Sequence, residues 1–207
     1  FRRVLFRSEE NIAIIPSDHF INDEDSYRET FAKAKSHLGL YNMMTIGVMP
    51  TKFNSDYGYI EAYEKIKEVL NVTRFKEKPR FDERHVFMDK SYYYWNTGIY
   101  MLNLDKFAHF TNLIDPYSIF VIGESYRQSK ILDGDIFLDR EFYRLATKNS
   151  FDVAFSENIG NMGMVESNFE WTDLGSWSSL FLKIDNDNFE GAKSSIEELQ
   201  RLENIND

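Results

Sequence analysis

Two aspartates stand where an α/β fold collects ligands. Asp18 follows the apolar run 11–15, and Asp173 lies in Trp171-Thr-Asp-Leu-Gly175, between an expected strand and an expected helix. Carboxylates at strand ends lie where such sheets bind ligands, and Mg²⁺ prefers one or two carboxylates together with phosphate oxygens. The pair therefore predicts a two-carboxylate magnesium site. The alternative, that each aspartate only caps a turn or a helix, stays open, because spacing cannot join residues so far apart.

His19, directly after Asp18, has no second histidine at a metal-binding spacing such as His-x-x-x-His. It is therefore interpreted as a structural histidine rather than as a metal ligand.

A second group of residues has the chemistry to bind a sugar phosphate. Lys78 stands between Glu77 and a proline at the end of an expected strand, so its ammonium can face a phosphate while Glu77 accepts hydrogen bonds from sugar hydroxyls. Gly58, between two tyrosines, lets backbone approach a ligand, and Asn96 offers a donor and an acceptor. The alternatives are a solvated Lys–Glu pair and ordinary turn residues.

The hydrophobic pattern predicts the elements that position these residues. Apolar runs predict strands at 11–15, 44–49, 72–75, 92–102 and 163–169, and helical periodicity predicts helices at 23–38, 104–110, 117–131 and 140–148. The first strand, first helix and second strand have the order of a βαβ unit, which predicts a largely parallel sheet. Residues 61–70 fit either an amphipathic helix or an irregular segment.

Composition limits the classes of partner. The chain of 207 residues carries a formal net charge of -10, which argues against a broad surface for nucleic acid or anionic lipid. It has no cysteine and no apolar run long enough to cross a membrane, so we expect no disulfide, no membrane partner and a cytoplasmic location. One domain is expected over residues 9–190. Residues 1–8 are expected to be a tail, a scar or a fragment edge, and 191–207 a polar tail that contains at most a peripheral helix.

Taken in order, the motifs resemble the mannose-1-phosphate guanylyltransferase family, the GDP-mannose pyrophosphorylases. Each motif is weak by itself, but seven in the right order over residues 11–182 are specific. The segments are Ile15-Pro-Ser-Asp-His-Phe-Ile21, Thr45-Ile-Gly-Val-Met-Pro-Thr51, Tyr57-Gly-Tyr-Ile-Glu61, Arg74-Phe-Lys-Glu-Lys-Pro79, Tyr94-Trp-Asn-Thr-Gly-Ile-Tyr100, Ser150-Phe-Asp-Val-Ala-Phe-Ser-Glu157 and Trp171-Thr-Asp-Leu-Gly-Ser-Trp177.

The resemblance implies a Rossmann-like α/β/α sandwich around a mixed, mostly parallel sheet. It also implies transfer of a guanylyl group from GTP to mannose 1-phosphate, with pyrophosphate as the leaving group and Mg²⁺ as the cofactor. In that family the residues matching Asp18 and Asp173 bind the metal and the one matching Lys78 contacts the sugar phosphate. The matches of Gly58, Glu77 and Asn96 face the mannose.

The chain departs from the family pattern in three places. The family's N-terminal strand and glycine-rich phosphate loop precede the matched part and are absent, so we expect this chain to be inactive by itself. Phe53, Ser55 and Asp56 replace the usual Pro and Thr-Gly. Residues 183–207 drift from the pattern. Transfer of another nucleotide or sugar, a non-catalytic sugar-phosphate-binding subunit, and a homo-oligomer all stay open.

Overall fold

The computed structural model describes residues 11–88, 91–158, 160–175 and 179–180. The expected tails at 1–8 and 191–207 lie outside the described residues. Within the described part, no helix combines the length and the apolar character that a membrane crossing needs.

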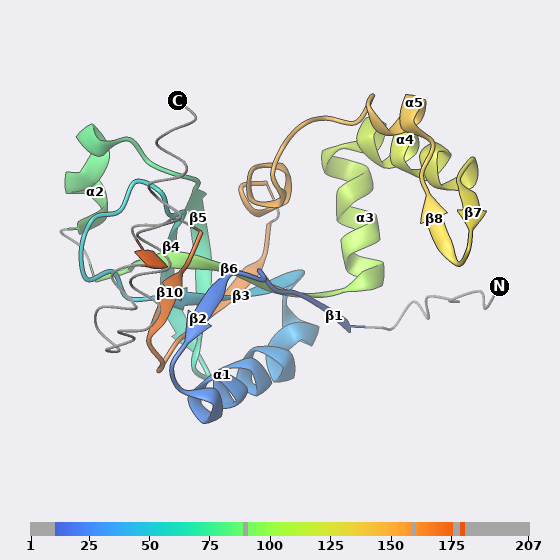
Figure 1. Ribbon diagram of the computed structural model, residues 1–207. Helices are drawn as coiled ribbons and strands as arrows, with labels where there is room; N and C mark the ends of the chain where they lie inside the picture. Colours follow the sequence, from blue (N-terminus) through green and yellow to red (C-terminus); the bar gives the residue numbers. More distant parts are fainter. Residues whose placement is uncertain (1–10, 89–90, 159, 176–178, 181–207) are drawn as a thin grey trace, which may run out of the picture.

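The main sheet has six strands in the spatial order β1-β6-β3-β9-β5-β4. β4 also pairs with β6, so the strands from β6 to β4 close into a barrel-like ring near the centre of Figure 1. Their bounds are Asn11–Ile14 for β1, Met43–Val48 for β3, Tyr59–Ile66 for β4, Val69–Lys76 for β5, Tyr93–Asn103 for β6 and Met162–Glu166 for β9.

The prediction of a mostly parallel sheet was wrong. Within the described residues, β3 and β9 form the parallel pair of the main sheet, and its other pairs are antiparallel. β1 and β3 do run in the same direction, as a βαβ unit requires, but β6 lies between them and is antiparallel to both. The order of strand, helix and strand therefore predicted the parallel direction of β1 and β3. It did not predict that β6 lies between them.

Residues 61–70, which the sequence left ambiguous, belong to an antiparallel hairpin of β4 and β5. The turn consists of Lys67 and Glu68, whose φ angles of 48° and 73° are both left-handed. Two positive φ angles are typical of a type I′ hairpin turn, where Asn-Gly or Asp-Gly is usual. Because lysine and glutamate stand there instead, the sequence gives no turn signal.

Helix α1, Glu24–His37, was predicted at nearly these bounds. Asp23 caps it by accepting a hydrogen bond from the backbone N–H of Ser26 at 3.0 Å. The 3₁₀ turn η1, Leu38–Leu40, follows directly. Buried Ala34 and Leu38 hold this helix against the sheet in the main core cluster, which leaves one face of the sheet covered by α1 (Figure 1).

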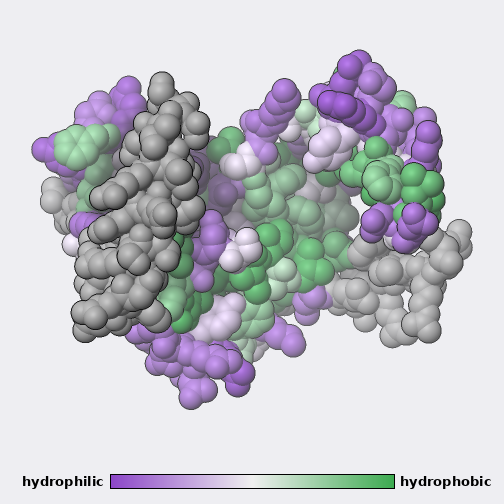
Figure 2. All heavy atoms as spheres, in the orientation of Figure 1, coloured by the Kyte–Doolittle hydropathy of each residue, from purple (hydrophilic) through white to green (hydrophobic). Residues whose placement is uncertain are grey.

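Helices α3, α4 and α5 and the short hairpin β7–β8 project from the other end of the sheet (Figure 1). The helices expected at 117–131 and 140–148 are both shorter in the structure. The first ends early because residues 130–137 form the hairpin around Asp133-Gly134. Apolar side chains gather on this lobe (Figure 2). The bounds are Leu104–Ile114 for α3, Pro116–Arg127 for α4, Arg140–Tyr143 for α5, Lys130–Leu132 for β7 and Asp135–Phe137 for β8.

The remaining elements are short. Two of them, β2 and β10, form a separate antiparallel ribbon. The others are helical turns. Their bounds are His19–Ile21 for β2, Phe81–Glu83 for the 3₁₀ turn η2, Arg84–Met88 for α2, Asp152–Ser156 for the π-helical turn η3 and Trp171–Asp173 for β10.

Alternation along β3 divides the core between the two sides of the sheet. Met44 belongs to the cluster that includes α1, whereas Met43 belongs to the cluster that contacts Phe107 and Phe110 of α3. On β9, Gly163 leaves the space that Met44 fills. A Cβ at Gly163 would lie 2.5 Å from the Met44 sulfur, so the packing here depends on a missing side chain.

We predict that Gly163→Ala destabilises the fold by about 1–3 kcal/mol, the usual range for overpacking a core. The added methyl group would also lie 2.9 Å from the buried ring of Tyr41, which cannot move aside easily. Gly39→Ala is the matched control, since nothing lies within 4 Å of its Cβ position. Urea denaturation measures both. Equal stability of the two variants would contradict the packing argument.

Candidate functional site

The β2–β10 ribbon brings the two predicted metal ligands together. β2 begins at His19, directly after Asp18, and β10 ends at Asp173. Asp173 lies opposite His19 in the ladder, and the backbone N–H of Leu174 donates to the carbonyl of Asp18 at 2.9 Å. One candidate ligand atom from each of Asp18, His19 and Asp173 lies within 4.8 Å of the other two. The carboxylates are therefore close enough to share one cation.

His19 is tied to the protein through its ring. The indole N–H of Trp171 donates to His19 Nδ1 at 3.1 Å, and the two rings meet edge to face. Burial lowers the pKa of His19, although the nearby carboxylates of Asp173 and Asp18 oppose this. A neutral ring that accepts at Nδ1 carries its proton on Nε2, so it can donate and is a poor metal ligand. This geometry agrees with a structural role for His19.

Gly175 leaves room beside the two carboxylates. Its backbone N–H donates to Asp173 Oδ1 at 2.7 Å. A Cβ at this position would lie 2.8 Å from Asp173 Oδ1 and 3.3 Å from Asp18 Oδ2, so any side chain would crowd both aspartates. Two carboxylates with hard oxygen atoms at the wall of a pocket fit the preference of Mg²⁺.

The predicted sugar-side residues line a pocket next to this carboxylate pair. The pocket has a volume of about 190 Å³, and Gly58, Glu77, Lys78, Asn96 and Asp173 are among its lining residues. A neighbouring pocket of about 280 Å³ shares Lys78 and Asp173 with it and adds Asp18. All six predicted residues therefore belong to one cleft, which is composed of these two pockets.

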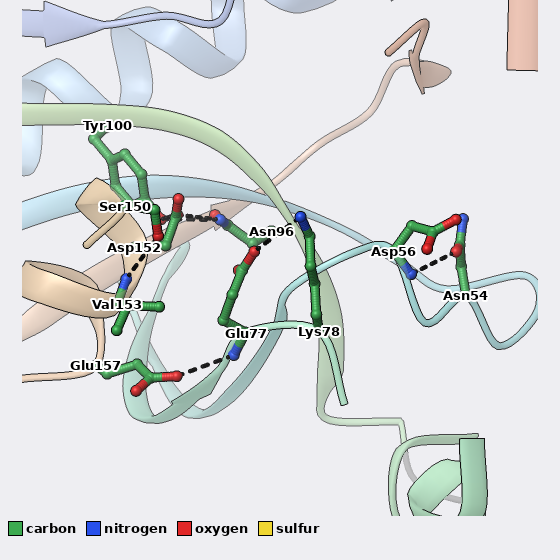
Figure 3. A network of polar contacts seen from close by, with 10 residues as sticks. All are labelled: Asn54, Asp56, Glu77, Lys78, Asn96, Tyr100, Ser150, Asp152, Val153 and Glu157. Carbon is green, nitrogen blue, oxygen red and sulfur yellow. Dashed lines mark hydrogen bonds and ion pairs between the residues drawn. The ribbon is translucent and has the colours of Figure 1, made fainter. Parts of the chain in front are cut away.

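Lys78 adopts an unusual backbone conformation at the cleft. Its φ of 43° is left-handed, in the position before Pro79. For a residue with a side chain this conformation costs about 1–2 kcal/mol. Strain of this kind gathers at functional sites, where the surrounding structure holds it in place. The ammonium is largely exposed and lies 3.8 Å from Glu77 Oε1, too far for a tight ion pair (Figure 3).

Glu77 is a half-buried carboxylate in an acidic environment. Burial is the main cause that raises its pKa, and Asp152 and Glu157 add to this while Lys78 opposes it. Its backbone N–H donates to Glu157 Oε1 at 3.2 Å. A Cβ at Gly58 would lie 2.7 Å from Glu77 Oε2. The space that this glycine leaves is thus used by the glutamate, rather than by a close approach of backbone to a ligand.

Asn96 is buried and its side-chain amide is fully engaged with the protein. Its Nδ2 donates to Tyr100 Oη at 2.9 Å and to Asp152 Oδ1 at 3.0 Å. Its Oδ1 accepts from the backbone N–H of Gly98 at 3.2 Å. Asn96 lines the cleft, but its hydrogen bonds organise neighbouring side chains, which differs from the free donor and acceptor that the sequence suggested (Figure 3).

Sequence reasoning assigned no role to several lining residues of the cleft, and three of them stand out. Asp152, Tyr57 and Trp171 all face it, and Tyr57 packs edge to face against Trp171 with 5.0 Å between ring centroids. All three lie in motifs that carried the family resemblance, so a signal was present. Their separate roles were not assigned, because an aspartate or an aromatic residue by itself is common in cores and turns.

The pKa of Glu77 leads to a pH prediction. Because this pKa is raised, the folded protein keeps a proton above the ordinary carboxyl range while the unfolded chain has lost it. The free energy of unfolding should therefore fall as pH rises through that window. Glu77→Gln removes the titration, so it should gain stability relative to wild type between about pH 4 and about pH 7.

Urea denaturation at both pH values tests this prediction. Glu141→Gln on exposed helix α5 is the matched control, since it removes one carboxylate far from the acidic group. If the free energy of unfolding has the same pH dependence in wild type and Glu77→Gln, then the pKa of Glu77 is not raised in the folded protein.

Comparison with known proteins agrees with this arrangement. The family model "Nucleotidyl transferase" matches residues 2–188. A mannose-1-phosphate guanylyltransferase of Salmonella muenchen is 31% identical over 82% of this chain and 36% of its own length. One of Escherichia coli is 28% identical over 81% of this chain and 37% of its own length. The chain thus spans about a third of the length of these curated relatives.

Two solved structures share the fold, each with a TM-score of 0.71. A Thermus thermophilus protein, described as a "mannose-1-phosphate geranyltransferase", is 24% identical, with 81% of this chain and 48% of that chain covered. A Helicobacter pylori protein, described as a "mannose-6-phosphate isomerase", is 25% identical, with 80% of this chain and 66% of that chain covered. The match of the family model over most of the residues, together with this shared mixed α/β fold, shows that the chain belongs to the nucleotidyl transferase family.

Proposed function

We propose that this chain forms the sugar-phosphate side of a mannose-1-phosphate guanylyltransferase, which makes GDP-mannose and pyrophosphate from GTP and mannose 1-phosphate. The observation that carries the proposal is the cleft itself. It combines the carboxylate pair Asp18 and Asp173 with Lys78 and the half-buried carboxylate of Glu77. The curated relatives named above support mannose 1-phosphate as the substrate.

Asp18 and Asp173 are the residues that would hold Mg²⁺. Bound there, Mg²⁺ would supply positive charge to the phosphate groups of the substrates. The protein's own contribution is to keep the two carboxylates together through the β2–β10 ribbon and to leave space at Gly175. The fit is chemical as well as geometric, because both ligands offer hard oxygen atoms.

The reaction needs positioning and charge neutralisation rather than a covalent intermediate. An oxygen of the sugar phosphate attacks the α-phosphorus of GTP, a new P–O bond forms, and the bond to the departing pyrophosphate breaks. Lys78 would hold the attacking phosphate with its ammonium, while Glu77 would accept a hydrogen bond from a sugar hydroxyl. Lys78 lines both the pocket that contains Asp18 and the pocket that contains Glu77, which suits a ligand with a phosphate at one end and hydroxyls at the other.

Metal binding by the carboxylate pair can be measured directly. We expect the chain to bind Mn²⁺, as a paramagnetic substitute for Mg²⁺, and each of Asp18→Asn and Asp173→Asn to weaken this binding at least about tenfold, since even outer-shell changes at metal sites cost that much. The matched control is Asp82→Asn, which removes the same charge from an exposed aspartate paired with Arg80. Titration followed by electron paramagnetic resonance gives the affinities. Unchanged binding in both site variants would rule out this metal site.

Binding of mannose 1-phosphate tests Lys78. A charge-assisted hydrogen bond is worth about 1.5–3 kcal/mol, so Lys78→Ala should weaken binding by roughly tenfold to a hundredfold. Lys78→Gly should lose the same affinity and yet be more stable than Lys78→Ala by about 1 kcal/mol, because glycine relieves the left-handed strain.

Calorimetric titration in the presence of Mg²⁺ and urea denaturation provide the two readouts. Glucose 1-phosphate serves as the comparison ligand for sugar choice. An affinity of Lys78→Ala within about twofold of wild type would support the alternative of a solvated Lys–Glu pair instead.

A further inference from the structure

Asp152 is held in one orientation by buried donors at the wall of the cleft. Its Oδ1 accepts hydrogen bonds from the hydroxyl of Tyr100 and from Asn96 Nδ2, the latter at 3.0 Å. Tyr100 is 1% exposed, and burial, together with the charge of Asp152, raises its pKa well above the ordinary value. The tyrosine therefore stays protonated and remains a donor. Figure 3 shows Asp152 between these two partners.

The second carboxylate oxygen of Asp152, Oδ2, does not share the hydrogen bonds that Oδ1 accepts. Among the described residues, none donates a hydrogen bond to Asp152 Oδ2, although Asp152 lines the pocket that also contains Glu77. An ionised carboxylate has acceptor capacity on both oxygens and loses stability when that capacity is unmet. One oxygen is thus fixed by the protein, and the other is left for a donor that comes from outside.

Asp152 also makes the part of the cleft beside Glu77 unfavourable for an anionic group of a ligand. The charge of Asp152 contributes to the raised pKa of its neighbour Glu77, so two carboxylates already repel each other here. A ligand that reduces this repulsion must bring hydrogen-bond donors without negative charge. Sugar hydroxyls meet both conditions, whereas a phosphate meets neither.

We propose that Asp152 is a specificity-determining residue of the cleft, which accepts a hydrogen bond from one hydroxyl of the bound sugar. This inference rests on the proposed function and adds a residue to it. Glu77 and Asp152 together would read two hydroxyls, while Lys78 holds the phosphate. Tyr100 and Asn96 act on the ligand through Asp152, as positioning residues.

The test uses calorimetric titration of the chain with mannose 1-phosphate and its monodeoxy analogues, in the presence of Mg²⁺. Asp152→Asn keeps an oxygen for Tyr100 and Asn96 but places an amide where the free acceptor stood. We expect it to weaken mannose 1-phosphate binding by roughly tenfold to a hundredfold, the range for a hydrogen bond to a charged group, and to leave inorganic phosphate binding unchanged. The deoxy analogue that lacks the hydroxyl bound by Asp152 should bind wild type weakly. It should bind wild type and Asp152→Asn with equal affinity.

Glu157→Gln is the matched control. Glu157 also raises the pKa of Glu77, but it does not appear among the described residues that line the cleft. If the effect of Asp152 came from charge alone, both variants would change sugar affinity equally, and that result would overturn the proposal. A loss spread evenly over every deoxy analogue would also overturn it, because it would indicate a structural role.

A second variant guards against misfolding of Asp152→Asn. Tyr100→Phe keeps the carboxylate and removes one of its two donors, so it should give a smaller loss directed at the same hydroxyl. Thermal melting checks that each variant is folded. If wild type binds no hexose 1-phosphate, the proposed function and this inference both fail. If wild type binds it and Lys78→Ala weakens it, but neither Asp152→Asn nor Tyr100→Phe discriminates among the analogues, this inference alone fails.

Discussion

Strand β6 is the constraint on which the fold and the cleft depend. Its eleven residues pair with β1 and β3 along one part and with β4 along another. The register against β3 shifts between Thr45 and Gly47, where β6 bulges around Gly98. Gly98 has a left-handed φ of 68°, and a Cβ there would lie 3.1 Å from Pro16. The bulge thus joins the wall of the cleft to the segment that leads into Asp18.

The electrostatics of the cleft follow from this arrangement. Most charged side chains that line the cleft are acidic. Among its described lining residues, Lys78 is the one with a basic side chain of the lysine or arginine type. A sugar phosphate, the ligand proposed above, would meet repulsion from Asp18, Asp173 and Glu77 unless a cation offset the charge. Metal binding and phosphate binding are therefore expected to support each other, since each ligand reduces the repulsion that opposes the other. A net charge of -10 over the whole chain strengthens this dependence.

Two glycines in the cleft serve the side chains beside them. At Gly58 the free space holds the carboxylate of Glu77, and at Gly175 it lies against both metal-ligand candidates. Close packing around a carboxylate limits its rotamers, which fixes the direction of its oxygen atoms before a ligand arrives. The same principle applies to Asp152, where hydrogen bonds from Tyr100 and Asn96 replace packing as the restraint. Preorganisation here comes from small residues and buried donors together.

The sequence by itself determined some of the local elements and the identity of the chemical groups. Helical periodicity over residues 23–38 predicted α1, because such periodicity is a local property of the sequence. The ordered motifs predicted the family and the six residues that the cleft collects. Local signals failed at Lys67 and Glu68, whose left-handed turn is enforced by the pairing of β4 with β5 rather than by their own preferences.

Only the tertiary structure decided which residues meet. Asp18 and Asp173 come together through the β2–β10 ribbon, and Asp152 reaches Asn96 from a distant turn. The insertion of β6 between β1 and β3 turned an expected parallel sheet into a mostly antiparallel one. Such pairings are set by the burial of side chains from many strands at once, a sum over the whole core that no single segment of the sequence contains.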